Sequence, residues 1–107
     1  MIQYSNLNFS KIEVHDSNIH LICDKNNKSK NIFIISHGSG GINHINLNIA
    51  NQACGNKYDV IIIDHFSKRK ISTQYWHDFN EKCSFFDMAN DIKNVLNSLQ
   101  YENIILL

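Results

Sequence analysis

Two short runs of apolar residues, 32–35 and 60–63, are the clearest pattern in the chain, and both are rich in β-branched side chains. A strand with one covered face alternates apolar and polar residues, so an unbroken apolar run indicates a strand covered on both faces. A third run, at 104–107, has the same character. Such runs are typical of a parallel sheet that lies between helices.

The segment before these runs predicts a hairpin. Residues 11–15 and 19–23 have the composition of extended segments, and three turn-forming residues, Asp16, Ser17 and Asn18, separate them. We therefore expect two antiparallel strands at the N-terminal end of the fold.

Helical spacing appears between the apolar runs. Ile42, Ile45, Ile49 and Ala53 recur at intervals of three or four residues, and Gly55 follows as a plausible C-terminal stop. A second and stronger stripe predicts a helix that buries Phe85, Met88, Ala89, Ile92, Val95, Leu96 and Leu99. Ser84 with Asp87 three residues later resembles a capping box at the start of that helix.

Together these elements predict an α/β protein whose sheet is mostly parallel, with an N-terminal hairpin and flanking helices. The length of 107 residues allows one domain. Ten Lys and Arg balance ten Asp and Glu, which argues against nucleic acid and acidic membranes as partners. There is no apolar stretch long enough for a membrane span, and no signal peptide pattern at the N-terminus.

The three cysteines, Cys23, Cys54 and Cys83, are widely spaced, odd in number and without a C-x-x-C pair. This spacing predicts buried, inert thiols rather than a disulfide framework, and it favours the reducing cytoplasm. The six histidines show no metal-binding motif, so we expect neither a metal nor a cofactor.

The chemically informative segment is His37-Gly38-Ser39-Gly40-Gly41, directly after the first buried strand. Glycines allow a sharp turn and leave backbone N–H groups unshielded. N–H groups between a strand and a helix can bind an anion. That anion is either a phosphate or the oxyanion of an acyl-transfer intermediate. A tight connection that binds no ligand is the third possibility.

If the anion is a phosphate, the hypothesis is a dinucleotide-binding domain. Gly38 and Gly40 match the first two glycines of its fingerprint, and Asp64, at the end of the next strand, would accept from a ribose hydroxyl. The third glycine of the fingerprint, however, falls on Asn43. A non-catalytic interaction module also stays open.

Two segments resemble the dienelactone hydrolase branch of the α/β-hydrolase family: 37–41, as H-G-x-G-G, and 64–69, as D-x-F-x-x-R. The resemblance implies hydrolysis of a small-molecule ester or lactone. It implies that the backbone N–H of Ser39 binds the oxyanion, that Gly38, Gly40 and Gly41 shape the loop, and that His37 orients it.

The same resemblance places the nucleophile, acid and base after Leu107, and the chain contains neither G-x-S-x-G nor G-x-C-x-G. Residues 1–107 are therefore predicted to be an incomplete hydrolase domain that ends at the start of the nucleophile strand and is inactive alone. Its last strand would leave an apolar sheet edge through which chains could self-associate.

The long segment between 65 and 82 predicts part of the substrate site. Phe66 and Trp76 would line an acyl or lactone pocket, and Arg69 would bind a substrate carboxylate. The alternative is a surface loop with packed aromatic side chains and solvated charges.

Overall fold

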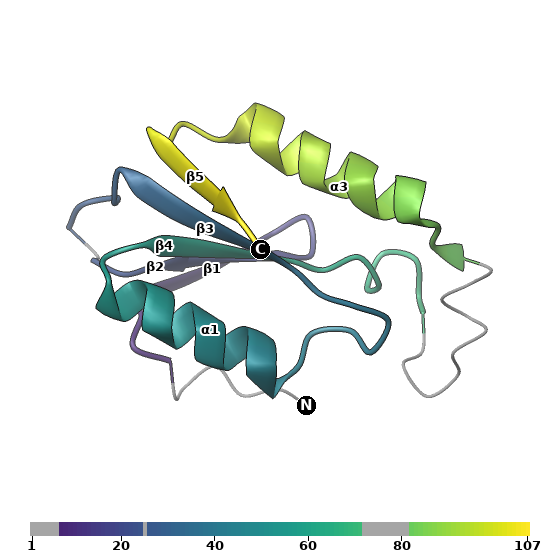
Figure 1. Cartoon of the computed structure of the whole chain (residues 1–107), viewed down its shortest axis with the longest axis horizontal. Helices are drawn as coiled ribbons and strands as arrows, with labels where there is room; N and C mark the ends of the chain where they lie inside the picture. Colours follow the sequence, from purple (N-terminus) through teal and green to yellow (C-terminus); the bar gives the residue numbers. More distant parts are fainter. Residues whose placement is uncertain (1–6, 25, 72–81) are drawn as a thin grey trace.

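The computed structural model describes residues 7–24, 26–71 and 82–107 (Figure 1). The elements follow one another as a hairpin, a strand, a helix, a strand, a helix and a strand, which confirms the predicted order. Their bounds are β1 (Lys11–His15), β2 (Asn18–Ile22), β3 (Asn31–Ser36), α1 (His44–Gly55), β4 (Asp59–Ile63), α3 (Phe85–Ser98) and β5 (Asn103–Leu106).

The five strands form a mixed sheet in the order β1-β2-β4-β3-β5. The β1–β2 and β2–β4 pairs are antiparallel, and the β3–β4 and β3–β5 pairs are parallel. The predicted fold class, a mostly parallel sheet with an N-terminal hairpin and flanking helices, is therefore wrong. An unbroken apolar run indicates that both faces of a strand are covered, but it does not indicate the direction of the strand. β2 is buried at four of its five positions and yet runs antiparallel to β4.

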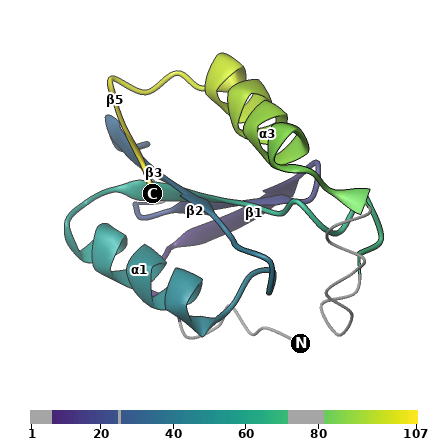
Figure 2. The ribbon, with the colours of Figure 1, turned by 45° about the vertical axis from the view of Figure 1, so that its right-hand side comes forward.

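The core has two parts, one on each face of the sheet, where Figures 1 and 2 show one helix on each side. Successive residues of a strand point to opposite faces. On the α1 side the buried residues are Ile19, Leu21, Ile35, Leu47, Ala50, Ala53, Val60 and Ile62. On the α3 side they are Ile32, Ile34, Ile61, Ile63 and Val95. The central strands β3 and β4 thus contribute side chains to both parts.

Helix α1 forms where it was predicted, and its buried face only partly matches the predicted stripe. Ala53 is buried and Ile42 and Ile49 pack against the core, as predicted. Ile45 is 68 % exposed, whereas Leu47, Ala50, Ala53 and Cys54 are buried. The prediction relied on the large isoleucines, whereas the small side chains of Ala50 and Ala53 allow the helix to lie close to the sheet. The helix begins with a reciprocal cap, in which the side chain of Asn43 accepts from the N–H groups of Ile45 and Asn46.

Helix α3 confirms the predicted capping box, since Ser84 and Asp87 each accept from the other's backbone N–H. Its contact with the sheet is narrower than the stripe predicted. Met88 and Val95 are buried, but Phe85 is 80 % exposed. At the sheet edge, β5 is exposed along its whole length, and the expected self-association through this edge stays a prediction. Within the described residues, no helix is both long enough and apolar enough to cross a lipid bilayer.

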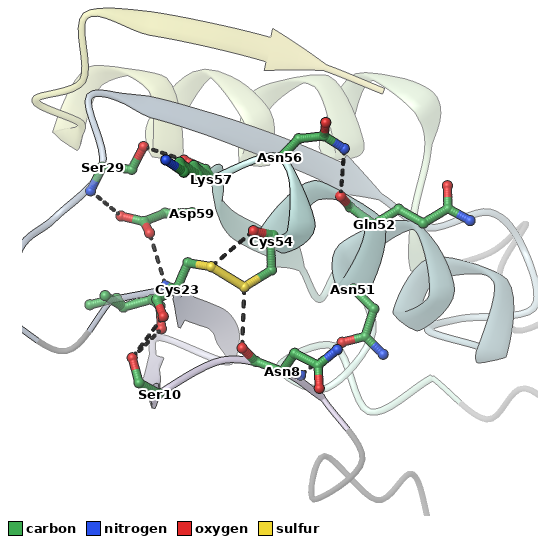
Figure 3. The surroundings of a disulfide bond; sticks show 11 residues. Asn8, Ser10, Cys23, Ser29, Asn51, Gln52, Cys54, Asn56, Lys57 and Asp59 are labelled. Carbon is green, nitrogen blue, oxygen red and sulfur yellow. Dashed lines mark hydrogen bonds between the residues drawn. A yellow bond between two sulfur atoms is a disulfide. The ribbon is translucent and has the colours of Figure 1, made fainter.

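Cys23 and Cys54 form a disulfide with a Cα–Cα distance of 5.5 Å, so the prediction of inert thiols is wrong for these two (Figure 3). Cys23 follows β2 and Cys54 lies in the last turn of α1, so sheet pairing and helix packing bring together residues that are 31 positions apart. Cys83 is a buried free thiol, as predicted. Because disulfides persist mainly in oxidising compartments, the cysteines no longer support the cytoplasmic prediction.

Beside the disulfide, the fully buried carboxylate of Asp59 joins three segments (Figure 3). It accepts from the backbone N–H of Cys23 and of Ser29 and from the hydroxyl of Tyr101, each at 3.0 Å. The Tyr101 hydroxyl in turn lies 2.9 Å from Nε2 of His20. Burial raises the pKa of Tyr101, which keeps this hydroxyl protonated and able to donate to Asp59.

Candidate functional site

The candidate site lies at the edge of the sheet where the parallel strands end. Ser36 pairs with Ile63 in the register of β3 and β4, so the glycine segment that follows β3 lies beside the residues that follow β4. Leu107 donates its N–H to the carbonyl of Ile34 at 2.9 Å, which places the end of β5 at the same edge. Ligands of sheets with parallel strands commonly bind at this edge.

His37 connects the two segments through both ring nitrogens. Its Nε2 accepts from the backbone N–H of His65 at 2.9 Å, so its Nδ1 carries the proton and donates to the carbonyl of Gly38 at 2.8 Å. The residue is only 2 % exposed, and burial lowers its pKa below the ordinary value of 6.5. The ring of Phe66 packs against it, with centroids 4.6 Å apart. A neutral His37 thus positions the start of the glycine segment.

His65 lies between a hydroxyl and a carboxylate. Its Nε2 is 2.7 Å from Oγ of Ser36, at the end of β3, and its Nδ1 is 2.7 Å from Oδ2 of Asp91, in α3. The side chain of His65 is fully buried. A carboxylate at Nδ1 favours the tautomer with its proton on Nδ1, which leaves the lone pair of Nε2 to accept from Ser36. Ser36, His65 and Asp91 therefore form a continuous serine–histidine–aspartate chain.

Arg69 holds the carboxylate of that chain in place. Its two terminal nitrogens donate to Oδ2 and Oδ1 of Asp91 at 2.7 and 3.0 Å, and Nη1 also donates to the carbonyl of His65 at 2.8 Å. Burial alone would raise the pKa of Asp91, but hydrogen bonds from Arg69 and His65 hold it below its ordinary value. Asp91 is therefore ionised at neutral pH. Asp91 therefore binds the guanidinium of Arg69, for which a substrate carboxylate was the predicted partner.

The glycine segment leaves backbone donors open. Among the described residues, the N–H groups of Gly38, Ser39 and Gly40 have no hydrogen-bond acceptor, and all three residues are exposed. The turn is closed by Gly41, whose N–H donates to the carbonyl of Gly38 at 3.0 Å and whose φ of 76° favours glycine. A Cβ built at Gly38 or Gly40 would meet no atom within 4 Å. The three N–H groups can therefore receive a ligand.

A cavity of about 500 Å³ is lined by two of these residues, Gly38 and Ser39, and by Ser36. Its lining joins the end of β3 to the first half of α3: Ser36, His37, Gly38, Ser39, Phe85, Met88, Ala89 and Ile92. A volume between about 300 and 1,000 Å³ suits a small organic molecule. A polar end and an apolar wall are what an ester or a lactone with a hydrocarbon part would need.

Three other residues, Phe66, Trp76 and Asp64, were predicted to contact a ligand. Phe66 is buried against His37 and is not part of the lining of this cavity, and Trp76 lies outside the described residues. Asp64, the ribose ligand of the dinucleotide hypothesis, accepts instead from the N–H groups of Phe66 and Ser67 at 2.9 and 3.0 Å. At the start of α1, the Asn43 side chain already occupies two of the N–H groups that a pyrophosphate would use.

Sequence reasoning missed the roles of Ser36, His65 and Asp91. Ser36 directly precedes the glycine segment and His65 lies within the 64–69 segment, and the pairing of β3 with β4 is the signal that would have connected them. Asp91 had no comparable signal, because its contact with His65 spans 26 residues and depends on where α3 packs.

In the part of the chain that the structure describes, no three or more His, Cys, Asp or Glu side chains are grouped so as to hold a metal ion. Searches against protein-family models, curated proteins and solved structures found no match to this chain.

Proposed function

We propose that this protein belongs to an enzyme that hydrolyses small-molecule esters or lactones, and that the segment 37–41 binds the oxyanion of the tetrahedral intermediate. The observation that carries the proposal is the row of three N–H groups, on Gly38, Ser39 and Gly40, that have no acceptor among the described residues. Two of these residues, Gly38 and Ser39, line a mostly apolar cavity. The resemblance of this segment to dienelactone hydrolases supports Ser39 as the main donor.

Attack on an ester carbonyl turns the carbonyl oxygen into an anion. Fixed N–H donors stabilise that anion more than they stabilise the neutral carbonyl, so they lower the barrier without any rearrangement during the reaction. His37 and Gly41 supply the rigidity, because each fixes the carbonyl of Gly38 by a hydrogen bond. The backbone between these bonds is thereby prevented from turning its N–H groups away.

The alternative hypotheses have less support. A dinucleotide would need the Asp64 carboxylate and the α1 N-terminus, and the chain's own groups use both. A non-catalytic interaction module does not require open N–H donors beside a buried His65 that is hydrogen-bonded to a hydroxyl. Esters and lactones therefore remain the substrates that best fit the site.

The test is hydrolysis of p-nitrophenyl acetate and of dihydrocoumarin by the protein as it is encoded in its gene. Gly38→Val places a branched side chain over the donors, and we expect it to lower kcat by roughly 10²–10³, the usual loss for one oxyanion donor. Ser39→Ala keeps the N–H and should change kcat little. Gly55→Val, at the end of α1, is the matched control, because a Cβ at Gly55 also meets no atom within 4 Å.

Circular dichroism should show the same fold for all three variants. If Gly38→Val kept full activity, or if Ser39→Ala were equally damaging, the N–H groups would not be the working donors and the proposal would fail. Equal losses in Gly38→Val and Gly55→Val would show a general effect on the fold instead.

A further inference from the structure

We propose that Ser36 is the nucleophile of this hydrolysis, with His65 as its general base and Asp91 as the residue that orients His65. The inference rests on the function proposed above and assigns the attacking group within the chain itself. It differs from what the resemblance implies, which is a nucleophile that comes after Leu107. The juxtaposition that carries it is the serine–histidine–aspartate chain beside the open N–H donors.

The geometry meets the requirements for such a group. A serine hydroxyl becomes nucleophilic when a base accepts its proton within about 2.6–3.2 Å and a third group fixes that base. Both distances at His65 are 2.7 Å. The residues come from the end of β3, the turn after β4 and the middle of α3, so three separate elements fix the arrangement.

The cavity of about 500 Å³ reaches this chain of residues at Ser36. His65 is fully buried and Asp91 faces Arg69, whereas Ser36 belongs to the lining of the 500 Å³ cavity. A substrate that enters this cavity therefore meets the hydroxyl before the base. Gly38 and Ser39, which carry two of the open N–H donors, line the same cavity, as an oxyanion site for attack by Ser36 requires.

The reaction balances within these groups. Oγ of Ser36 forms a bond to the ester carbonyl carbon while its proton passes to Nε2 of His65, and the carbonyl oxygen becomes the oxyanion. Collapse breaks the bond to the leaving alkoxide, which takes the proton from His65 and departs as the alcohol, or stays attached when the substrate is a lactone. Water then attacks the acyl carbon while one of its protons passes to Nε2 of His65. Collapse breaks the bond to Oγ of Ser36, which takes that proton back, and the free acid is released.

Arg69 is a positioning residue in this scheme. Its two bonds to Asp91 and its bond to the carbonyl of His65 hold the carboxylate against Nδ1. With the proton fixed on Nδ1, the lone pair of Nε2 points to Ser36. The short side chain of Asp91 alone would be free to rotate away from the histidine.

The experiment is labelling with diisopropyl fluorophosphate, which phosphorylates activated serines, followed by tandem mass spectrometry of peptides from the protein as encoded in its gene. We expect the label on Ser36 and a loss of hydrolysis in proportion to the label. Ser36→Ala should lose both. Ser67→Ala is the matched control, because it removes the hydroxyl of an exposed serine shortly after β4 and should be labelled and active like the wild type.

His65→Gln should slow labelling by at least about 100-fold, the lower end of the usual contribution of a general base. A label on another residue, with hydrolysis intact, would overturn the assignment of Ser36 and leave the proposed function standing. No label and no hydrolysis that responds to Gly38→Val would overturn both. The wild-type peptide map needs no variant, so the result does not depend on the folding of Ser36→Ala.

Discussion

The two ends of the parallel strands use the same kinds of residue for opposite purposes. At the amino end of β4, the carboxylate of Asp59 takes three donors from its own chain, and the Cys23–Cys54 disulfide joins β2 to α1 beside it. At the carboxyl end, Asp91 and His65 form a chain that ends on the Ser36 hydroxyl at a cavity. Both ends contain an aspartate and a histidine, but at the carboxyl end the N–H groups of Gly38, Ser39 and Gly40 have no acceptor among the described residues.

This difference separates stability from chemistry. A buried polar group costs free energy unless it is hydrogen-bonded. At the amino end, the carboxylate of Asp59 is hydrogen-bonded by groups of the same chain, so this network stabilises the fold. At the carboxyl end, the rings of His37 and His65 are hydrogen-bonded, while the N–H groups of residues 38–40 have no acceptor among the described residues. Changes at the amino end should therefore alter the free energy of unfolding, while changes at the carboxyl end should alter binding and reaction.

The largest expected effect is at the amino end. Closing a loop of 31 residues with the Cys23–Cys54 disulfide should stabilise the protein by about 3–4 kcal/mol in the chain-entropy model. Cys23→Ser combined with Cys54→Ser should lower the unfolding midpoint in urea accordingly, while the Gly38→Val effect on kcat stays the same. Thiol titration should find one free thiol in the unreduced, unfolded protein and three after reduction.

Cys83→Ala is the control, because it removes the one free thiol and leaves the disulfide in place. Three reactive thiols without reduction would show that the pair is not formed. An equal loss of stability in Cys83→Ala would contradict the contrast between the two ends.

A smaller effect should appear with pH at the carboxyl end. Burial lowers the pKa of His37, so below the ordinary value of 6.5 the unfolded chain takes up a proton before the folded one does. The stability that the neutral ring contributes is present above pH 6.5 and is lost as the pH falls towards the folded pKa. We expect the free energy of unfolding to fall between pH 7 and 5, by no more than about 1.4 kcal/mol per pH unit from this group. His37→Gln should make the slope shallower.

His20 is the matched control from the other network, because burial also lowers its pKa and it contacts Tyr101. His20→Gln should reduce the slope in the same range, but only His37→Gln should also change the pH dependence of hydrolysis. A slope that neither variant changes would mean that neither ring stays neutral in the fold.

The smallest effects concern two backbone positions, one at each end. Ser17, in the β1–β2 turn, has a φ of 71°, and Lys57, after α1, has a φ of 66°. Both lie in the left-handed region, which costs a residue with a side chain about 1–2 kcal/mol, while glycine gives back about 0.5–1 kcal/mol through its freedom in the unfolded chain. Ser17→Gly and Lys57→Gly should each stabilise by about 0.5–1 kcal/mol.

Thermal unfolding measures both changes, and Ser17→Ala is the control because it keeps the Cβ. We expect no change in hydrolysis from Lys57→Gly. A loss of activity in Lys57→Gly would show that the two ends are coupled.

The sequence was sufficient for local structure, because local signals are contained in neighbouring residues. The cap at Ser84, the turn at Asp16 and Ser17 and the unbroken run of β4 each involve a few consecutive positions. Strand direction depends on pairing between segments far apart in the chain, and the buried apolar residues of β2, Ile19, Leu21 and Ile22, are compatible with either direction. The sheet was therefore predicted in its parts and not in its arrangement.

The same limit applies to the site. Glycines and a histidine in one short segment indicated the loop, because the chemistry of the loop lies in its own backbone. The disulfide and the contact between His65 and Asp91 join residues 31 and 26 positions apart, and the packing of each helix decides which of them meet. Arg69 was predicted to bind a substrate carboxylate, and in the structure it binds the carboxylate of Asp91, which lies 22 positions away in the chain.

The reversed direction of β2 has a consequence for how this protein could change over evolutionary time. Because β2 runs against β4, the two-residue turn of the hairpin comes to the same edge as the end of β4, where Asn18 accepts from the N–H of Asp64 and Asp16 pairs with Lys68. A second cavity, of about 400 Å³, lies here and is lined by the turn, by Arg69 and by Asp91. Residues inserted between Asp16 and Ser17 would extend the wall of that cavity without changing the register of any strand. The hairpin thus offers a place where new specificity could arise by lengthening one turn, with the core and the reacting groups left as they are.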